Sequence, residues 1–155
     1  GFNRLTPFFK RLQLYFSIDA HNKSEQPIRI LIVDDDGVSR LIGRRILESL
    51  GHKVDCVETG SQALHMVSEN HYDLILMDLL MPDMDGIDTA QLIKQHPQES
   101  VRSTPILALS GTTSARKKFQ CLESAMDDFV AKPINKASAS EILREWVPQH
   151  SSRQR

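Results

Sequence analysis

The chain has 155 residues, 40% of them hydrophobic and 25% charged, which fits one soluble globular domain with an extension. Its 19 Lys and Arg residues nearly balance 20 Asp and Glu residues, so the net charge of -1 gives no reason to expect nucleic acid as a partner. The two cysteines, Cys56 and Cys121, lack a CxxC pattern, which argues against a zinc site or a disulfide framework and fits a cytoplasmic location.

The first 27 residues have a pattern of their own. Between Leu5 and Phe16, apolar residues recur at three- and four-residue spacing among basic residues, which predicts an amphipathic helix followed by a polar linker. Three interpretations remain open: a connecting helix or a dimerising helix (residues 5–16) from a larger parent, a helix packed on its own domain, and an anchor at a membrane surface. No apolar run reaches the roughly 20 residues of a transmembrane segment. Because the chain starts with Gly1, we expect a processed chain or a fragment.

From residue 28 onward, short apolar runs alternate strictly with segments of helical period. The predicted strands are Arg29–Val33, Lys53–Val57, 72–77, 105–109 and 129–131. The predicted helices are 38–50, 61–69, 87–95, 115–124 and 137–147. This alternation predicts an α/β domain over residues 28–148, with a five-stranded parallel sheet covered by helices on both faces, and a polar tail over 149–155.

Four of these strands run into polar residues of a particular kind. Asp34, Asp35 and Asp36 follow the first strand, and the other three strands lead into Asp78, Ser110 and Lys132. The carboxyl ends of parallel strands meet at one edge of the sheet, where ligands bind in such folds. We therefore expect these groups to converge.

Carboxylates that lie close together repel one another unless a cation separates them. Ligands that are all oxygens favour Mg²⁺, and Mg²⁺ in turn binds phosphate oxygens. A lysine and a hydroxyl beside the metal could hold a phosphoryl group. The simpler alternative is that the acids only cap helices and end strands, and for Asp36 we prefer it: Asp36 is predicted to cap the first helix, with Ser39 three residues on.

The segments LIVDDD, LILMDLLMPDMDG, ILALSG and DDFVAKPI resemble the motifs of response-regulator receiver domains over about residues 28–147. The resemblance implies a flavodoxin-like fold with sheet order 2-1-3-4-5. It also implies a phosphoacceptor, Asp78, which takes its phosphoryl group from a histidine kinase or a histidine phosphotransfer protein. The other implied roles are Mg²⁺ ligation by Asp34 (through water), Asp35, Asp78 and the Leu80 carbonyl, and phosphoryl contacts from Ser110, as a moving hydroxyl, and Lys132.

Several positions bear on how such a switch works. The resemblance implies that Phe129 is the aromatic ring that turns inward on activation, and without a hydroxyl it is expected to prefer the buried position. Leu80 and Thr112 occupy positions that tune hydrolysis in the family, and neither side chain offers a base to orient water. Where the family commonly ends a helix with Gly, this chain has Ala125, which must adopt a left-handed conformation unless the helix ends differently.

The sequence leaves two alternative functions to consider. The stretch from Asp34 to Val38 resembles the nucleophile motif of haloacid-dehalogenase-type phosphatases, but no further acidic pair follows a later strand and Asp78 would have no role. A phosphorylation-independent binding module is the second alternative, and the complete set of site residues counts against it. As an isolated module the chain is expected to catalyse only its own phosphorylation and dephosphorylation. The end of the chain around Trp146 resembles receivers of hybrid sensor histidine kinases.

The first predicted helix suggests where a phosphodonor docks. Its period places a stripe of residues against the sheet, namely Ser39, Ile42, Gly43, Ile46, Leu47 and Leu50. Leu41 points away from this stripe, and Val38 lies on its flank near the acidic residues. Isolated surface leucines are ordinary, but a histidine-bearing helical bundle must come close to Asp78, so Val38 and Leu41 are predicted to form a docking patch.

Overall fold

The structure is a computed structural model that describes residues 27–111, 116, 120 and 123–147. The predictions for residues 1–26, for Thr112, for most of the helix 115–124 and for the tail 149–155 lie outside the described residues. Among the described residues, no helix is long and apolar enough to cross a membrane.

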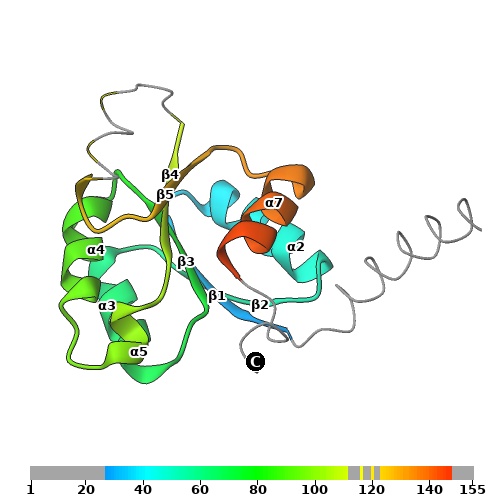
Figure 1. Cartoon of the computed structure of the whole chain (residues 1–155). Coiled ribbons are helices and arrows are strands. Elements are labelled where there is room, and N and C mark those ends of the chain that lie inside the picture. Colours follow the sequence, from blue (N-terminus) through cyan, green and yellow to red (C-terminus); the bar gives the residue numbers. More distant parts are fainter. Residues whose placement is uncertain (1–26, 112–115, 117–119, 121–122, 148–155) are drawn as a thin grey trace, which may run out of the picture.

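Five parallel strands form one sheet in the order β2-β1-β3-β4-β5, which confirms the predicted fold class. The chain runs from the inner strand β1 to β2 at one edge, and then returns past β1 to β3 at the middle of the sheet, so the strand order reverses beside β1 (Figure 1). The strands are β1 (Arg29–Val33), β2 (Lys53–Val57), β3 (Leu74–Asp78), β4 (Ile106–Ser110) and β5 (Asp128–Ala131). Asp78 and Ser110 are thus the last residues of their strands.

Helices cover both faces of the sheet (Figure 1). One face carries α2 (Gly37–Ser49) and α7 (Lys136–Trp146). The other carries α3 (Gly60–Glu69), α4 (Gly86–Lys94) and α5 (Glu99–Arg102). The short helix α5 was not predicted, because one turn is too brief to show a period in the sequence.

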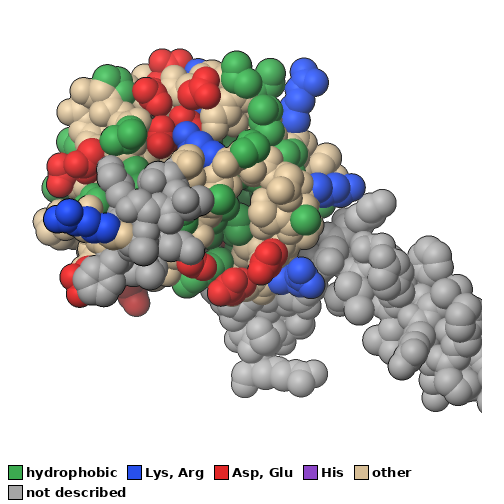
Figure 2. All heavy atoms as spheres, turned by 90° about the horizontal axis from the view of Figure 1, so that it is seen from above, with side chains coloured by type: hydrophobic (Ala, Val, Ile, Leu, Met, Phe, Trp, Pro, Cys, Tyr) green, Lys and Arg blue, Asp and Glu red, His purple; other side chains and the backbone are tan. Residues whose placement is uncertain are grey.

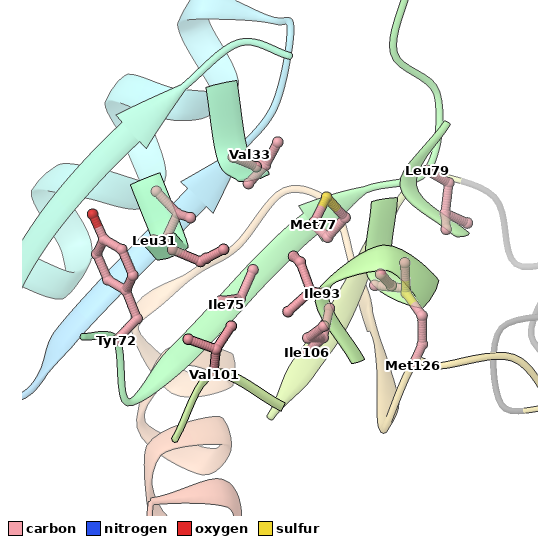
Figure 3. Packing of buried hydrophobic residues seen from close by; sticks show 14 residues of the cluster. Leu31, Val33, Tyr72, Ile75, Met77, Leu79, Ile93, Val101, Ile106 and Met126 are labelled. Atoms are coloured by element: carbon pink, nitrogen blue, oxygen red, sulfur yellow. The ribbon is translucent and has the colours of Figure 1, made fainter. Parts of the chain in front are cut away.

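A separate hydrophobic core lies on each face. The core under α3 and α4 includes Leu31, Ile75, Met77 and Ile106 from the strands (Figure 3). The core under α2 and α7 is formed mainly by the residues that alternate with these along the strands: Ile30, Ile32, Leu74, Leu76, Leu107 and Leu109. Because successive side chains of a strand point to opposite faces, the continuous apolar runs of the sequence feed both cores at once.

One residue of α2 differs from the sequence prediction, and one of the two alternatives left open at Ala125 is observed. Ile42, placed in the stripe of α2 that faces the sheet, is 40% exposed, and only Gly43 and Leu47 of that helix are fully buried. The stripe is narrower than predicted because the helix approaches the sheet closely at Gly43, where an added Cβ would lie 3.0 Å from Ile32 Cδ1. Ala125 does not adopt a left-handed conformation, since no described residue other than glycine has a positive φ. The chain before β5 therefore turns differently from the expected glycine-ended helix.

The carboxyl-terminal helix is tied to the amino-terminal end of β5. The indole Nε1 of Trp146 donates a hydrogen bond of 3.1 Å to Asp128 Oδ2, and Trp146 packs against the core under α2 and α7. Trp146 is the single tryptophan of the chain.

Candidate functional site

Strand register brings the polar strand ends together. Val33 pairs with Met77 across β1 and β3, so the next residues, Asp34 and Asp78, lie side by side. Ser110 pairs with Ala131 across β4 and β5, and the backbone N–H of Lys132 donates to the Ser110 carbonyl at 2.9 Å. The predicted convergence at one edge of the sheet is therefore observed.

Three carboxylates gather at this edge. Asp34, Asp35 and Asp78 each offer an oxygen within 4.8 Å of the others. Asp34 is fully buried and Asp78 is 7% exposed, whereas Asp35 is exposed. A site with two buried carboxylates and one open to solvent can take a hard cation from solution and bind it with oxygen ligands, which is the chemistry of Mg²⁺.

Lys132 neutralises part of this charge. Its Nζ lies 2.8 Å from Asp34 Oδ2 and 3.4 Å from Asp78 Oδ1. Lys132 follows the last residue of β5, and the peptide bond between Lys132 and Pro133 is cis. From this position its ammonium group reaches the cluster. Lys132 therefore stands where it can contact both the carboxylates and any group bound to them.

The pKa values of the two buried carboxylates shift in opposite directions. Burial and the neighbouring charge of Asp34 raise the pKa of Asp78 to about 6. Burial also acts to raise the pKa of Asp34, but hydrogen bonds from Lys132, the Asp36 backbone and Ser39 outweigh it, and the net pKa is lowered. For Lys132, burial is outweighed by the two carboxylates, which raise its pKa. At neutral pH both acids and the lysine are therefore charged. Of these three groups, Asp78 has the pKa nearest to neutral pH.

The loop after β1 is held by contacts that the sequence did not reveal. Arg40 donates to the Asp34 carbonyl at 2.7 Å and to Glu58 Oε1 at 2.9 Å. Arg40 and Glu58 are separated by 18 positions and carry no motif, so nothing in the sequence predicted the contact.

Asp36 is the N-cap of α2, as predicted, and its Oδ1 accepts a hydrogen bond from the Val38 N–H at 3.2 Å. With this carboxylate engaged at the helix end, the phosphatase interpretation loses the second acid of its nucleophile motif.

The other residues predicted for the site differ in how far they are exposed to solvent. Ser110 is 8% exposed, and Phe129 is half-buried and packs against the core under α3 and α4. Leu80 follows Asp78 by two positions and is 69% exposed, and its N–H lies 3.4 Å from Asp78 Oδ1. Thr112 lies outside the described residues.

Exposed apolar side chains lie at the start of α2, beside the acidic cluster. Val38 is 66% exposed and Leu41 51%, and Ile42 adds to them instead of facing the sheet. Seen from above, the molecule shows acidic side chains gathered around a basic one, with hydrophobic side chains close by (Figure 2).

Comparison with known proteins identifies this arrangement. The profile described as "Response regulator receiver domain" matches residues 30–144. The chain belongs to this family. The receiver motifs expected from the sequence are thus confirmed at the level of family and fold.

Three proteins illustrate what this receiver domain is similar to. Sensor protein GacS of Pseudomonas syringae is 36% identical over 125 residues, which cover 80% of this chain and 14% of GacS. The receiver domain of sensor histidine kinase PA1611 from Pseudomonas aeruginosa, solved with magnesium in its active site cleft, is 35% identical with a TM-score of 0.71, covering 78% of this chain and 98% of that one. The receiver domain of Ssk1 from Saccharomyces cerevisiae, solved with the histidine phosphotransfer protein Ypd1, is 27% identical with a TM-score of 0.71, covering 80% and 91%.

The receiver domain spans only a small part of its curated relatives. Besides the 14% of GacS, it covers 17% of the aerobic respiration control sensor ArcB of Escherichia coli, with 32% identity. These relatives are sensor kinases much longer than a receiver domain.

Proposed function

We propose that this receiver domain is the phosphoacceptor of a phosphorelay, in which Asp78 takes a phosphoryl group from a phosphohistidine of a histidine kinase or a histidine phosphotransfer protein. The observation that carries the proposal is the placement of Asp78: a carboxylate with a pKa of about 6, within 3.4 Å of Lys132 and beside two further acids at the carboxyl edge of the sheet. A nucleophile, a cation and a metal-binding set at one point are what phosphoryl transfer needs.

The transfer exchanges one bond to phosphorus for another. A carboxylate oxygen of Asp78 forms a bond to the phosphorus atom, and the bond from phosphorus to the histidine nitrogen breaks with its electron pair going to the imidazole. The imidazole then takes a proton from water. Asp78 is ionised at pH 7, because its raised pKa of about 6 is still below neutrality, so it can act as the nucleophile without a separate base.

We assign the metal site to Asp34, Asp35, Asp78 and the Leu80 backbone carbonyl, with Asp34 acting through water. Support comes from three carboxylates within 4.8 Å and from the magnesium in the cleft of the PA1611 receiver domain. When bound there, Mg²⁺ would neutralise the charge on the phosphoryl oxygens. Lys132 would move its ammonium group from the carboxylates onto a phosphoryl oxygen, and Ser110 would donate to another. Phe129, half-buried beside β4, would then turn inward.

The module reports its state to other proteins and is not an enzyme that turns over a separate substrate. We propose that the parent is a hybrid sensor histidine kinase, because relatives with more than 30% identity include sensor kinases such as GacS and ArcB. We propose a cytoplasmic location for this domain. Val38 and Leu41, both exposed beside the acidic cluster, are the proposed docking residues for the phosphodonor.

Labelling with a small phosphodonor tests the assignment directly. Acetyl phosphate or beryllofluoride should modify the wild-type protein only in the presence of Mg²⁺, and Asp78→Asn should abolish labelling. Stoichiometric labelling of Asp78→Asn, or labelling of wild type in excess chelator, would contradict the assignment. A phosphatase would instead release many equivalents of phosphate from a phosphate monoester, so the same preparation assayed for turnover separates the two functions.

A further inference from the structure

The loop between β3 and α4 (residues 79–85) begins and ends at the phosphoacceptor. It leaves β3 at Asp78, and the first residue of α4, Gly86, returns to the same place, where its N–H donates to the Leu79 carbonyl at 3.0 Å. A Cβ at Gly86 would overlap the carbonyl oxygen of Asp78, so only glycine allows this approach. The loop carries Leu80, and its conformation therefore fixes the surroundings of Asp78.

The far side of this loop is attached to α3. The Asp83 carboxylate accepts hydrogen bonds from the Gly60 N–H at 3.1 Å, from the Ser61 N–H at 3.1 Å and from the Ser61 hydroxyl at 2.7 Å. The first N–H groups of a helix have no partner within the helix, and the helix end attracts negative charge. These bonds lower the pKa of Asp83 to about 2, so the carboxylate stays ionised near neutral pH.

A second contact makes the attachment close. A Cβ at Gly60 would overlap the Thr89 hydroxyl and would lie 3.1 Å from Met84 Cβ, so the start of α3 packs tightly against the end of the loop and the first turn of α4. Thr89 is fully buried and donates to the Asp85 carbonyl at 2.8 Å. We call the contacts of Asp83 with Gly60 and Ser61 the loop latch.

The segment between β2 and α3 also holds the other loop of the site. Glu58 accepts a hydrogen bond from Arg40, whose second nitrogen donates to the Asp34 carbonyl. Residues 58–61 contribute no carboxylate to the acidic cluster. Glu58 is nevertheless linked through Arg40 to the backbone of Asp34, and Gly60 and Ser61 are bonded to the loop that follows Asp78. These residues are placed to set the distance between the two halves of the cluster.

We propose that Asp83 is a positioning residue for metal-dependent phosphoryl transfer: through the loop latch it holds Asp78 and the Leu80 carbonyl in the arrangement that binds Mg²⁺. The inference rests on the proposed function of Asp78. A positioning role differs from simple capping of α3. If Asp83 were only a cap, its removal would lower the stability of the fold without changing the Mg²⁺ concentration that labelling requires. Groups that orient metal ligands without touching the metal commonly change metal affinity by about 10-fold or more when removed.

The test measures Mg²⁺ affinity by calorimetric titration without a phosphodonor, and also the Mg²⁺ concentration that half-saturates labelling by acetyl phosphate. Asp83→Ala removes the whole latch. Asp83→Asn removes the same charge but keeps an oxygen that accepts one of the N–H bonds. Asp88→Ala, in the exposed first turn of α4, removes one acidic charge nearby and leaves the latch intact. Ser61→Ala removes the hydroxyl bond and keeps both backbone donors.

We expect Asp83→Ala to raise the half-saturating Mg²⁺ concentration by about 10-fold. Asp83→Asn and Ser61→Ala should fall between it and wild type, and Asp88→Ala should match wild type. The labelling rate at saturating Mg²⁺ should fall much less than the rate at low Mg²⁺. Circular dichroism should show the same secondary structure in all variants, because Asp83 is exposed.

Equal Mg²⁺ dependence in wild type and Asp83→Ala would overturn the positioning role. An equal effect of Asp88→Ala would overturn it too, because loss of any nearby negative charge would then explain the change. If Asp83→Ala did not fold, an unchanged Mg²⁺ dependence in Asp83→Asn and Ser61→Ala would overturn the role in the same way. Absence of Mg²⁺-dependent labelling in the wild-type protein would instead remove the proposed function of Asp78 itself, so the two failures are distinguishable.

Discussion

Lys132 Nζ lies 2.8 Å from Asp34 Oδ2, an oxygen of the carboxylate cluster that we assign to Mg²⁺. Lysine and metal ion therefore compete for the same negative charge. We expect Lys132→Met to bind Mg²⁺ about 3- to 10-fold more tightly, the effect of removing one unit charge a few ångström away in a hydrated site. Labelling by acetyl phosphate should nevertheless slow by about 100-fold, because a cation for the phosphoryl oxygens is lost. Calorimetric titration with Mg²⁺ and a labelling time course measure the two effects. Weaker Mg²⁺ binding in the variant would show that Lys132 organises the cluster instead.

Asp78 should destabilise the metal-free fold at neutral pH. Its pKa rises from 3.8 to about 6 on folding, so the folded state holds the proton more tightly than the unfolded chain does. Stability contributed by the protonated form is thus lost as pH rises from about 4 to about 6, and stays lost above that. Asp78→Asn should therefore be more stable than wild type at pH 7.5, by an amount of the order of 2 kcal/mol, and this gap should close at pH 4.

Urea denaturation followed by circular dichroism, in chelator at both pH values, measures this difference. Addition of Mg²⁺ should stabilise wild type and leave Asp78→Asn nearly unchanged, because only the former retains the full ligand set. A gap of the same size at pH 4 and pH 7.5 would contradict the electrostatic explanation.

The phosphorylated form should be long-lived. Leu80, exposed and two residues beyond Asp78, offers no base to a water molecule and is expected to cover part of the approach to the phosphorus atom. Replacing it in Leu80→Asn supplies an amide that can orient water, so decay of the label should accelerate several-fold. The measurement follows loss of label after removal of the donor. Decay of wild type within seconds, or equal lifetimes in the two proteins, would count against this role of Leu80.

Docking of the phosphodonor should depend on Leu41. Leu41→Asp places a charge in the exposed apolar patch beside the acidic cluster and should slow transfer from a histidine phosphotransfer protein by roughly 10-fold or more. Labelling by acetyl phosphate should be unchanged. Leu92→Asp is a matched control, because Leu92 is 44% exposed and lies on α4, on the other face of the sheet. Equal loss in both variants, or loss of acetyl phosphate labelling in Leu41→Asp, would show that Leu41 has no specific role in docking.

The fold and the acidic cluster were predictable because both depend on local patterns. Apolar runs that alternate with helical segments specify a parallel sheet, and a parallel sheet brings its carboxyl ends together. Asp34, Asp78, Ser110 and Lys132 each follow or end such a run, so the convergence needed no knowledge of side-chain contacts.

Two features could not be predicted from the sequence, because they depend on how closely helices, loops and the sheet approach one another. Ile42 has the period of a core residue and is exposed because α2 comes down on the sheet at Gly43. The contact between Asp83 and Ser61 joins residues 22 positions apart, and no pattern links a loop aspartate to the start of another helix. Both depend on tertiary distances, which local periodicity does not encode.

The bond between Trp146 and Asp128 gives the protein a built-in optical reporter. Asp128 starts β5 and Lys132 follows the end of that strand, so the indole and the acidic cluster sit at opposite ends of the same short segment. An event at the cluster that shifts β5 or α7 would change the surroundings of Trp146. A change in emission of this single tryptophan on treatment with beryllofluoride would therefore report a rearrangement of β5 or α7, without any dye or added label.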